Sequence, residues 1–218
     1  MDDPIQRHPT RAEQLDILTT LIARRCQPGD RVLDLGCGTG YLAYLLADKR
    51  PGLVITGADI DETSLASARE TASRLPVEFE PVRLDLTAPG EAALPFDDYA
   101  VACTCLTFHD LPDPAKREVV EWVGRHLRPG GVFFIYDRLR LEHESLFVLQ
   151  RDLWDRMQRR YGRGMRTAAS FAEYEADIGP ANQPARLSDY LDWYEQCGFD
   201  AQCVHLHGNV ALLAGARR

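Results

Sequence analysis

The sequence lacks any long apolar run. No stretch approaches the roughly 20 consecutive apolar residues that a membrane-spanning helix needs. The N-terminal stretch MDDPIQRHPTRAEQ is acidic and polar, whereas a secretory signal peptide is basic and then apolar. We therefore expect a cytoplasmic protein without membrane association.

Basic residues are fewer than acidic ones, and the 218 residues carry a formal net charge of −8. Broad nucleic-acid binding depends on a basic surface that neutralises phosphates, so the composition disfavours a nucleic-acid partner. One group of arginines clusters in sequence, and we interpret it as a solvated helix face. The group comprises Arg151, Arg156, Arg159, Arg160, Arg163 and Arg166.

The cysteines do not form a recognisable framework. Their scatter through apolar segments does not resemble the spacing of disulfide-rich secreted domains. Cys103 and Cys105 form a close pair, but no second pair stands at ligand spacing, so a buried strand is favoured over a zinc site. We expect reduced thiols and no metal. The six are Cys26, Cys37, Cys103, Cys105, Cys197 and Cys203.

Apolar runs and helical patterns alternate in the first part of the chain. This alternation predicts a mainly parallel α/β sheet with helices on both faces. Asp113 is expected to cap a helix that has Pro114 in its first position. The expected strands are 31–35, 53–58, 77–86, 99–106 and 132–136, and the expected helices are 41–50, 63–75 and 113–128.

The alternation breaks after the fifth strand. Residues 141–185 lack a strong strand pattern and are expected to be mostly helical. A helix at 188–197 and strands at 201–207 and 210–214 follow. Only Gly208-Asn209 separates these strands. Because so short a link cannot hold a crossover helix, we predict an antiparallel hairpin.

Three glycines follow the first expected strand, at Gly36, Gly38 and Gly40. A turn of this kind lets a ligand lie against backbone amides at a helix N-terminus. Dinucleotide sites prefer a third glycine one residue later, where this chain has Tyr41. This departure disfavours a nicotinamide-dependent oxidoreductase.

The stretch Asp-Leu-Gly-Cys-Gly-Thr-Gly at 34–40 resembles the first motif of class I S-adenosylmethionine-dependent methyltransferases. In that family the loop cradles the methionine part of S-adenosylmethionine, and the acid at Asp34 helps to position it. The resemblance runs from Arg31 to the end of the chain. It implies a Rossmann-like, seven-stranded, mostly parallel sheet with an antiparallel last strand. Residues 1–218 then form one domain with a helical lid insertion at about 141–185.

Further cofactor contacts follow from the resemblance. Asp59 stands about 20 residues after the glycine turn, where a carboxylate can accept both ribose hydroxyls; the alternative role of helix N-cap suits Asp61 better. Asp85 matches the acid that contacts the adenine amino group in the family, or else is an exposed loop residue. The expected cofactor-binding set is Asp34, Gly36, Cys37, Gly38, Gly40, Asp59, Ile60, Asp85, Leu86, Thr104 and Cys105.

Two residues are candidates for catalysis. His109 follows the fourth strand, and histidine is the side chain that commonly exchanges a proton in catalysis. It is therefore the first candidate for a general base, with a loop-holding role as the alternative. Asp137 follows the fifth strand and could accept a proton, bind an amine or cap a turn. Arg11, on a helix expected at 5–26, could meet a carboxylate of cofactor or substrate. The aromatics of 141–185 either line an apolar pocket or belong to the core.

The acceptor is expected to be a small molecule with an O, N or C nucleophile. The Asn-Pro-Pro-Tyr signature of many amino-methylating nucleic-acid enzymes is absent, and Thr104-Cys-Leu-Thr107 stands in its place. One alternative is an enzyme similar to carboxy-S-adenosylmethionine synthase, which acts in tRNA modification and has a similar insertion. Another is a non-catalytic cofactor-binding partner of a second protein. The sequence predicts neither the acceptor nor the oligomeric state.

Overall fold

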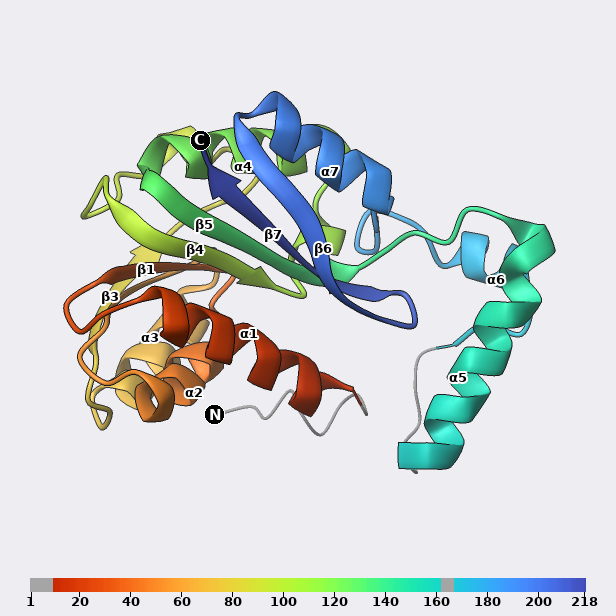
Figure 1. The fold of residues 1–218 in the computed structure, drawn as a ribbon, viewed down its shortest axis with the longest axis horizontal. Coiled ribbons are helices and arrows are strands. Elements are labelled where there is room, and N and C mark those ends of the chain that lie inside the picture. The colour runs from red at the N-terminus through yellow and green to blue at the C-terminus, as the bar shows by residue number, and fades with distance from the viewer. Residues whose placement is uncertain (1–9, 162–166) are drawn as a thin grey trace.

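A single seven-stranded sheet organises the protein (Figure 1). The computed structural model describes residues 10–161 and 167–218. The strand order is β3-β2-β1-β4-β5-β7-β6; β1 to β5 are parallel, and β7 runs antiparallel to both of its neighbours. This arrangement confirms the predicted sheet. The strands are β1 (Arg31–Leu35), β2 (Val54–Asp59), β3 (Glu78–Arg83), β4 (Tyr99–Cys105), β5 (Leu127–Arg138), β6 (Phe199–His207) and β7 (Val210–Arg217).

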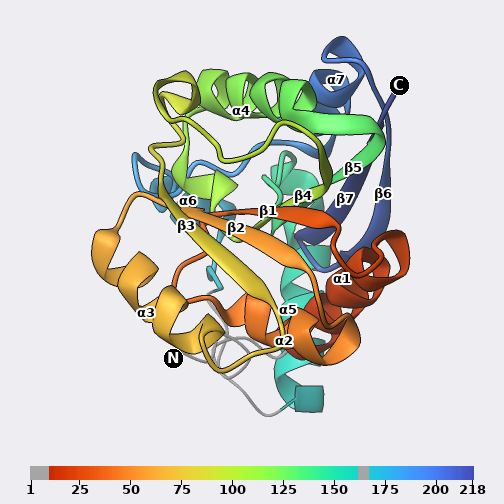
Figure 2. The same cartoon turned by 90° about the vertical axis from the view of Figure 1, so that its left-hand side faces the viewer.

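Helices cover both faces of the sheet (Figures 1 and 2). One face carries α1 (Arg11–Arg25), α2 (Tyr41–Lys49) and α3 (Glu62–Ala72). The opposite face carries α4 (Asp113–His126) and α7 (Leu187–Gln196). Two apolar clusters fill these interfaces. Burial on both faces explains why the central strands read as continuous apolar runs rather than alternating ones.

The strand register brings several carboxyl ends to one edge. Leu35 pairs with Thr104 of β4, while Asp34 pairs with Gly57 of β2. In open α/β sheets, ligands bind beyond this edge. The residues that follow β1, β2, β4 and β5 are therefore neighbours in space.

The last two strands form the predicted antiparallel hairpin. His207 pairs with Val210 across the turn of Gly208 and Asn209. Gly208 has a φ of +64°, a left-handed conformation that a tight hairpin turn favours and glycine adopts freely.

Some boundaries differ from the sequence-based expectation. β5 begins at Leu127 because this residue pairs with Tyr99 before a register shift. β3 ends at Arg83, so Asp85 and Leu86 lie beyond the strand. The prediction that Asp113 caps α4 was wrong: Pro112 occupies the N-cap position, and the Asp113 carboxylate instead accepts a hydrogen bond from Lys116 Nζ at 2.6 Å.

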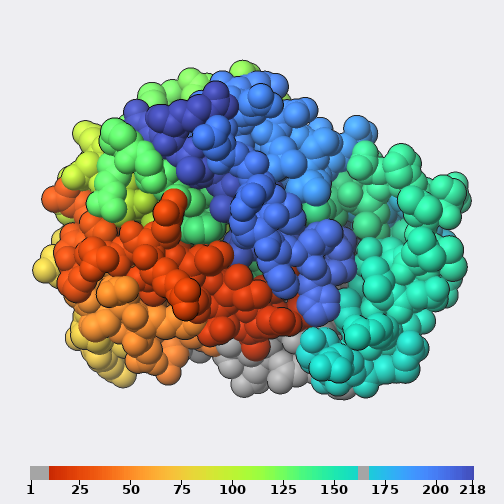
Figure 3. Space-filling model, in the orientation of Figure 1, coloured from red at the N-terminus to blue at the C-terminus, as the bar shows by residue number. Residues whose placement is uncertain are grey.

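The described parts of the segment 141–185, residues 141–161 and 167–185, lie beside the carboxyl ends of the strands (Figure 1). The segment contains α5 (Phe147–Tyr161) and α6 (Phe171–Ala176). Its two ends meet where the amide of Arg140 donates to the carbonyl of Ala185 at 2.9 Å. In the space-filling view α5 lies against the β6–β7 turn (Figure 3), and the rings of Tyr161 and His207 are 6.4 Å apart.

Two expectations extend beyond the described residues. The expected helix at 5–26 is α1 where it is described, and residues 5–9 lie outside that part, as do Arg163 and Arg166. Arg151, Arg156, Arg159 and Arg160 are exposed on α5. In the ranges 10–161 and 167–218 no helix has the length and apolar character needed to cross a membrane.

Candidate functional site

The loop that contains Gly36, Gly38 and Gly40, which we call the glycine loop, is hydrogen-bonded to β2 through its backbone amides. The amides of Gly36 and Cys37 donate to the carbonyl of Ala58 at 2.8 and 3.1 Å. The amide of Gly38 donates to Asp59 Oδ2 at 2.8 Å. Gly36 has a φ of +71°, and a Cβ there would stand 2.3 Å from Thr107 Oγ1. Only glycine fits this position, because both the backbone conformation and the contact exclude a side chain.

Asp34 is a buried carboxyl group at the carboxyl end of β1, 2% exposed. Its Oδ1 atom receives a weak contact from the Cys103 thiol at 3.9 Å, and Oδ2 has no hydrogen-bond partner within the described part of the chain. Burial, assisted by the charge of Asp59, raises the pKa of Asp34 to about 7. A buried carboxylate without donors is costly, so this group is suited to receive a cation or a hydrogen-bond donor.

A cavity of about 360 Å³ lies against this loop, and we call it the glycine-loop cavity. Five of the residues expected to bind the cofactor line it: Asp34, Gly36, Cys37, Gly38 and Cys105. Burial raises the pKa of the Cys105 thiol well above its usual range, so this thiol stays uncharged at neutral pH. The remaining lining residues are Arg11, Leu15, Thr39, Tyr41, Leu42, Ser64, Leu106 and Tyr136.

Other expected residues support the loop or flank it. Asp59 holds the amides of Gly38 and Asp61, and Gly40 stands at the N-cap of α2 in a left-handed conformation. Asp61 caps α3, as the alternative interpretation assigned it: its carboxylate accepts from the amides of Thr63 and Ser64.

The outer residues of the expected set do not line the glycine-loop cavity. Ile60 is exposed over 53% of its surface. Asp85 is an exposed residue whose carboxylate accepts from the Thr87 amide at 2.8 Å. Leu86 packs in the core, and Thr104 is fully buried with no partner for its hydroxyl among the described residues.

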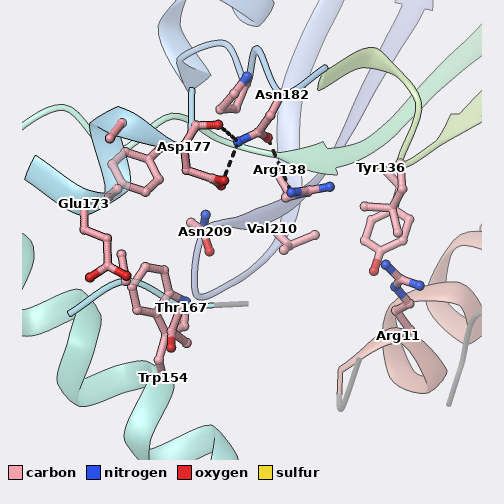
Figure 4. Close-up of a pocket in the computed structure, with 15 residues that line it drawn as sticks. Arg11, Tyr136, Arg138, Trp154, Thr167, Glu173, Asp177, Asn182, Asn209 and Val210 are labelled. Atoms are coloured by element: carbon pink, nitrogen blue, oxygen red, sulfur yellow. Dashed lines mark hydrogen bonds between the residues drawn. The ribbon is translucent and has the colours of Figure 1, made fainter. Parts of the chain in front are cut away.

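A second cavity, of about 480 Å³, opens beside the first (Figure 4). We call it the insertion cavity, because residues of 141–185 form much of its wall. It shares Arg11, Leu106 and Tyr136 with the glycine-loop cavity, so the two spaces meet at one wall. Its other lining residues are Arg138, Trp154, Thr167, Ala168, Glu173, Tyr174, Ala176, Asp177, Asn182, Pro184, Asn209 and Val210.

The shared wall contains a strained residue. Leu106 has a φ of +56°, a left-handed conformation that is uncommon for leucine. Its amide donates to the carbonyl of Tyr136 at 2.8 Å, which fixes the chain as it leaves β4. The Tyr136 hydroxyl in turn bonds to Gln14 Oε1 at 3.0 Å, and burial raises its pKa. The Leu106 backbone and the Tyr136 side chain are therefore both held by hydrogen bonds at the wall between the cavities.

The two catalytic candidates contact each other. His109 Nδ1 lies 2.6 Å from Asp137 Oδ1, and the His109 amide donates to Asp137 Oδ2 at 2.8 Å. Arg138 Nη2 lies 2.5 Å from His109 Nε2. A guanidinium only donates hydrogen bonds, so we assign the Nδ1–H tautomer to His109. Neither His109 nor Asp137 is among the described residues that line these two cavities, whereas Arg138 lines the insertion cavity. The expectation that both act in catalysis stays a prediction.

Sequence reasoning missed Arg138, Leu106 and Tyr136. One signal was available for Arg138, because it follows Asp137 at the carboxyl end of a central strand. No pattern indicated the left-handed Leu106. Both interpretations of the aromatics hold in part: Trp154 and Tyr174 line the insertion cavity, while other aromatics of the segment pack among themselves, Phe147 against Phe171 at 5.6 Å.

Comparisons with known proteins agree with this geometry. Residues 32–131 match the family model described as a methyltransferase domain. The chain is 29% identical over 154 residues to the carboxy-S-adenosyl-L-methionine synthase of Chromohalobacter salexigens, covering 68% of this chain and 56% of that protein. It is 29% identical over 166 residues to the 27-O-demethylrifamycin SV methyltransferase of Amycolatopsis mediterranei, covering 76% and 58%. The chain thus spans just over half the length of these relatives.

A solved structure shows the same fold. An O-methyltransferase family protein from Burkholderia thailandensis superimposes with a TM-score of 0.67 at 18% identity, covering 94% of this chain and 55% of that one. The matched domain includes the glycine loop, Asp34, Asp59 and Asp85. Residues 32–131 thus match a methyltransferase domain, and the sheet and the first motif are similar to those of class I S-adenosylmethionine-dependent methyltransferases.

Proposed function

We propose that this protein binds S-adenosylmethionine in the glycine-loop cavity and transfers its methyl group to a small-molecule acceptor in the insertion cavity. The observation that carries the proposal is the buried carboxyl group of Asp34, which lines the glycine-loop cavity and whose Oδ2 atom has no hydrogen-bond partner in the ranges 10–161 and 167–218. A cationic ammonium group is the kind of ligand that satisfies such an oxygen.

The residues around Asp34 fit the rest of the cofactor. The Asp59 carboxylate lies at the rim of the loop, where it can accept ribose hydroxyls. The exposed Ile60 side chain offers apolar surface to the adenine, and Asp85 offers an acceptor for its amino group. Bound S-adenosylmethionine supplies an electrophilic methyl group on a sulfonium.

The chain's own residues then orient and enclose the reactants. Leu106 and Tyr136 stand between the cavities and restrict the approach of the acceptor. Orientation of this kind is the main contribution a protein makes to an in-line displacement. Both imidazole nitrogens of His109 are engaged within the protein, so we assign His109 and Asp137 a positioning role, holding Arg138 at the cavity wall.

Calorimetric titration with S-adenosylhomocysteine tests the proposal. We expect micromolar binding by the wild type and a weakening of roughly tenfold to a hundredfold in Asp59→Asn, which loses the charged acceptor. The matched control is Asp61→Asn, two residues away, which retains the α3 cap and should bind like the wild type. Absence of binding by the wild type, with no cofactor retained on purification by mass spectrometry, would refute the proposal.

A second candidate is an activity of the carboxy-S-adenosylmethionine synthase type. It is favoured by the similarity to the Chromohalobacter protein of that name and by the insertion after β5. Mass spectrometry of the cofactor after incubation separates the two: a carboxylated cofactor supports this candidate, and a demethylated cofactor with a methylated acceptor supports the first.

A further inference from the structure

The guanidinium of Arg138 contacts only neutral groups among the described residues. Its Nη2 contacts His109 Nε2 at 2.5 Å, and its Nη1 donates to Asn182 Oδ1 at 3.4 Å. No ion pair joins its guanidinium to a carboxylate of the described residues. The nearby Arg140, by contrast, is paired with Glu175 at 3.2 Å.

The partners of Arg138 are themselves fixed. His109 is held by two hydrogen bonds to Asp137, and Asn182 Nδ2 donates to the carbonyl and the carboxylate of Asp177 at 2.9 and 3.1 Å. Asn182 is therefore oriented with its amide oxygen toward the guanidinium (Figure 4). A guanidinium has five N–H donors, and two contacts leave others for a ligand.

The site is half-buried and lines the insertion cavity. A half-buried cation without a counter-ion is a site for an anion, and the guanidinium fork matches a planar carboxylate. Glu173 and Asp177 also line this cavity. Their charges repel a dianion such as a phosphate more strongly than a ligand with a single negative charge.

The remainder of the wall is aromatic and apolar. Trp154, Tyr174 and Tyr136 contribute rings, and Leu106 and Val210 contribute aliphatic surface. A volume of about 480 Å³ accommodates a small organic molecule. We propose that the acceptor is a small aromatic carboxylic acid whose carboxylate binds Arg138; this deepens, and rests on, the methyltransferase function proposed above.

Arg138 is distinct from the cofactor-binding wall. It lines only the insertion cavity, whereas Arg11 lines both. A carboxylate at Arg138 therefore belongs to the acceptor rather than to the cofactor. Loss of Arg138 should leave the binding of S-adenosylhomocysteine unchanged.

The test is calorimetric titration with 4-hydroxybenzoate and with its neutral analogue 4-hydroxybenzamide, with and without S-adenosylhomocysteine. We expect the wild type to bind the acid roughly tenfold to a hundredfold more tightly than the amide. Arg138→Gln should abolish this preference, and Arg138→Lys should keep part of it. The matched control is Arg140→Gln, which removes a neighbouring arginine that does not line the cavity.

Each outcome decides one claim. Equal binding of acid and amide, no binding of the acid at millimolar concentration, or an unchanged preference in Arg138→Gln would overturn the carboxylate site. Wild-type protein that binds the acid through Arg138 but does not bind S-adenosylhomocysteine would overturn the proposed function instead. Normal S-adenosylhomocysteine affinity in Arg138→Gln also shows that this variant is folded.

Discussion

The two cavities share a wall but are built differently. The glycine-loop cavity is formed largely by one continuous stretch, from Asp34 to Leu42, with its backbone close to the ligand space. The insertion cavity is formed by side chains from α1, β5, α5, α6 and the β6–β7 turn. The first is a local motif, and the second exists only once distant segments have packed.

The difference between the two cavities indicates that specificity for the acceptor depends on the insertion cavity. A binding site formed by backbone atoms accepts one ligand shape and tolerates few substitutions, so it suits a cofactor that many relatives share. A wall of side chains can change residue by residue while the sheet remains, so it suits an acceptor that differs between relatives. The following predictions test this division, beginning with the largest effect.

Gly36→Ala should disrupt the glycine-loop cavity most. The left-handed backbone costs about 1–2 kcal/mol for a side chain, and the clash with Thr107 adds about 1–3 kcal/mol. We expect a loss of about 2–5 kcal/mol in urea unfolding. The control Gly38→Ala has a φ of +52° but open space at its Cβ, so it should lose only the backbone contribution. Equal losses in the two variants would contradict the packing argument.

Trp154→Ala tests whether the insertion is an independent unit. Trp154 is 4% exposed and packs edge-on against Phe147 at 5.8 Å. Removing a buried tryptophan costs about 3 kcal/mol or more. We expect hydrogen exchange to accelerate in α5 and α6 but not in β1 or β4, with S-adenosylhomocysteine affinity retained. Leu149→Ala, on the exposed side of α5, is the control; loss of cofactor binding in Trp154→Ala would argue against two separate regions.

Stability of the ligand-free protein should fall as the pH rises from about 4 to 7. Burial raises the native pKa of Asp34 to about 7, above its ordinary value of 3.8. The native state therefore holds a proton that the unfolded state has released in this range, with a slope of up to about 1.4 kcal/mol per pH unit. Above pH 7 this contribution levels off.

Asp34→Asn should flatten that slope, measured by urea unfolding at several pH values. An ammonium ligand favours the ionised carboxylate, so the stabilisation of the wild type by S-adenosylhomocysteine should grow over the same range. An unchanged slope in the variant would show that another group dominates.

The helix caps give the smallest expected difference. Asp61 caps α3 beside the glycine loop, and Ser170 caps α6 of the insertion by accepting from the Glu173 amide. Replacing either by alanine should cost about 1 kcal/mol. We expect Asp61→Ala to lower global stability, and Ser170→Ala to fray α6 and weaken acceptor binding only. Thermal unfolding, together with titrations of each variant with S-adenosylhomocysteine and with 4-hydroxybenzoate, would detect a reversal of this pattern.

The sequence by itself determined the sheet, the hairpin and the candidate cofactor loop. Each depends on neighbours in sequence: alternating apolar runs fix strands and helices, and the short Gly208-Asn209 link permits only an antiparallel pair. The position of Asp61 as a helix cap was readable for the same reason. Asp113 was misassigned by one position: the N-cap of α4 is Pro112, and the Asp113 carboxylate contacts Lys116 instead.

Only the tertiary structure decided which side chains line the insertion cavity. His109 and Asp137 are separated by 28 residues in sequence, and they contact each other in the structure. His109 also contacts Arg138, and of these three residues only Arg138 lines the insertion cavity. Arg138 and Asn182 meet across 44 residues. No local pattern encodes such meetings, because they result from parallel strands ending at one edge and from the insertion packing beside it. That the Arg138 guanidinium has no carboxylate partner among the described residues could therefore be recognised only after the chain had folded.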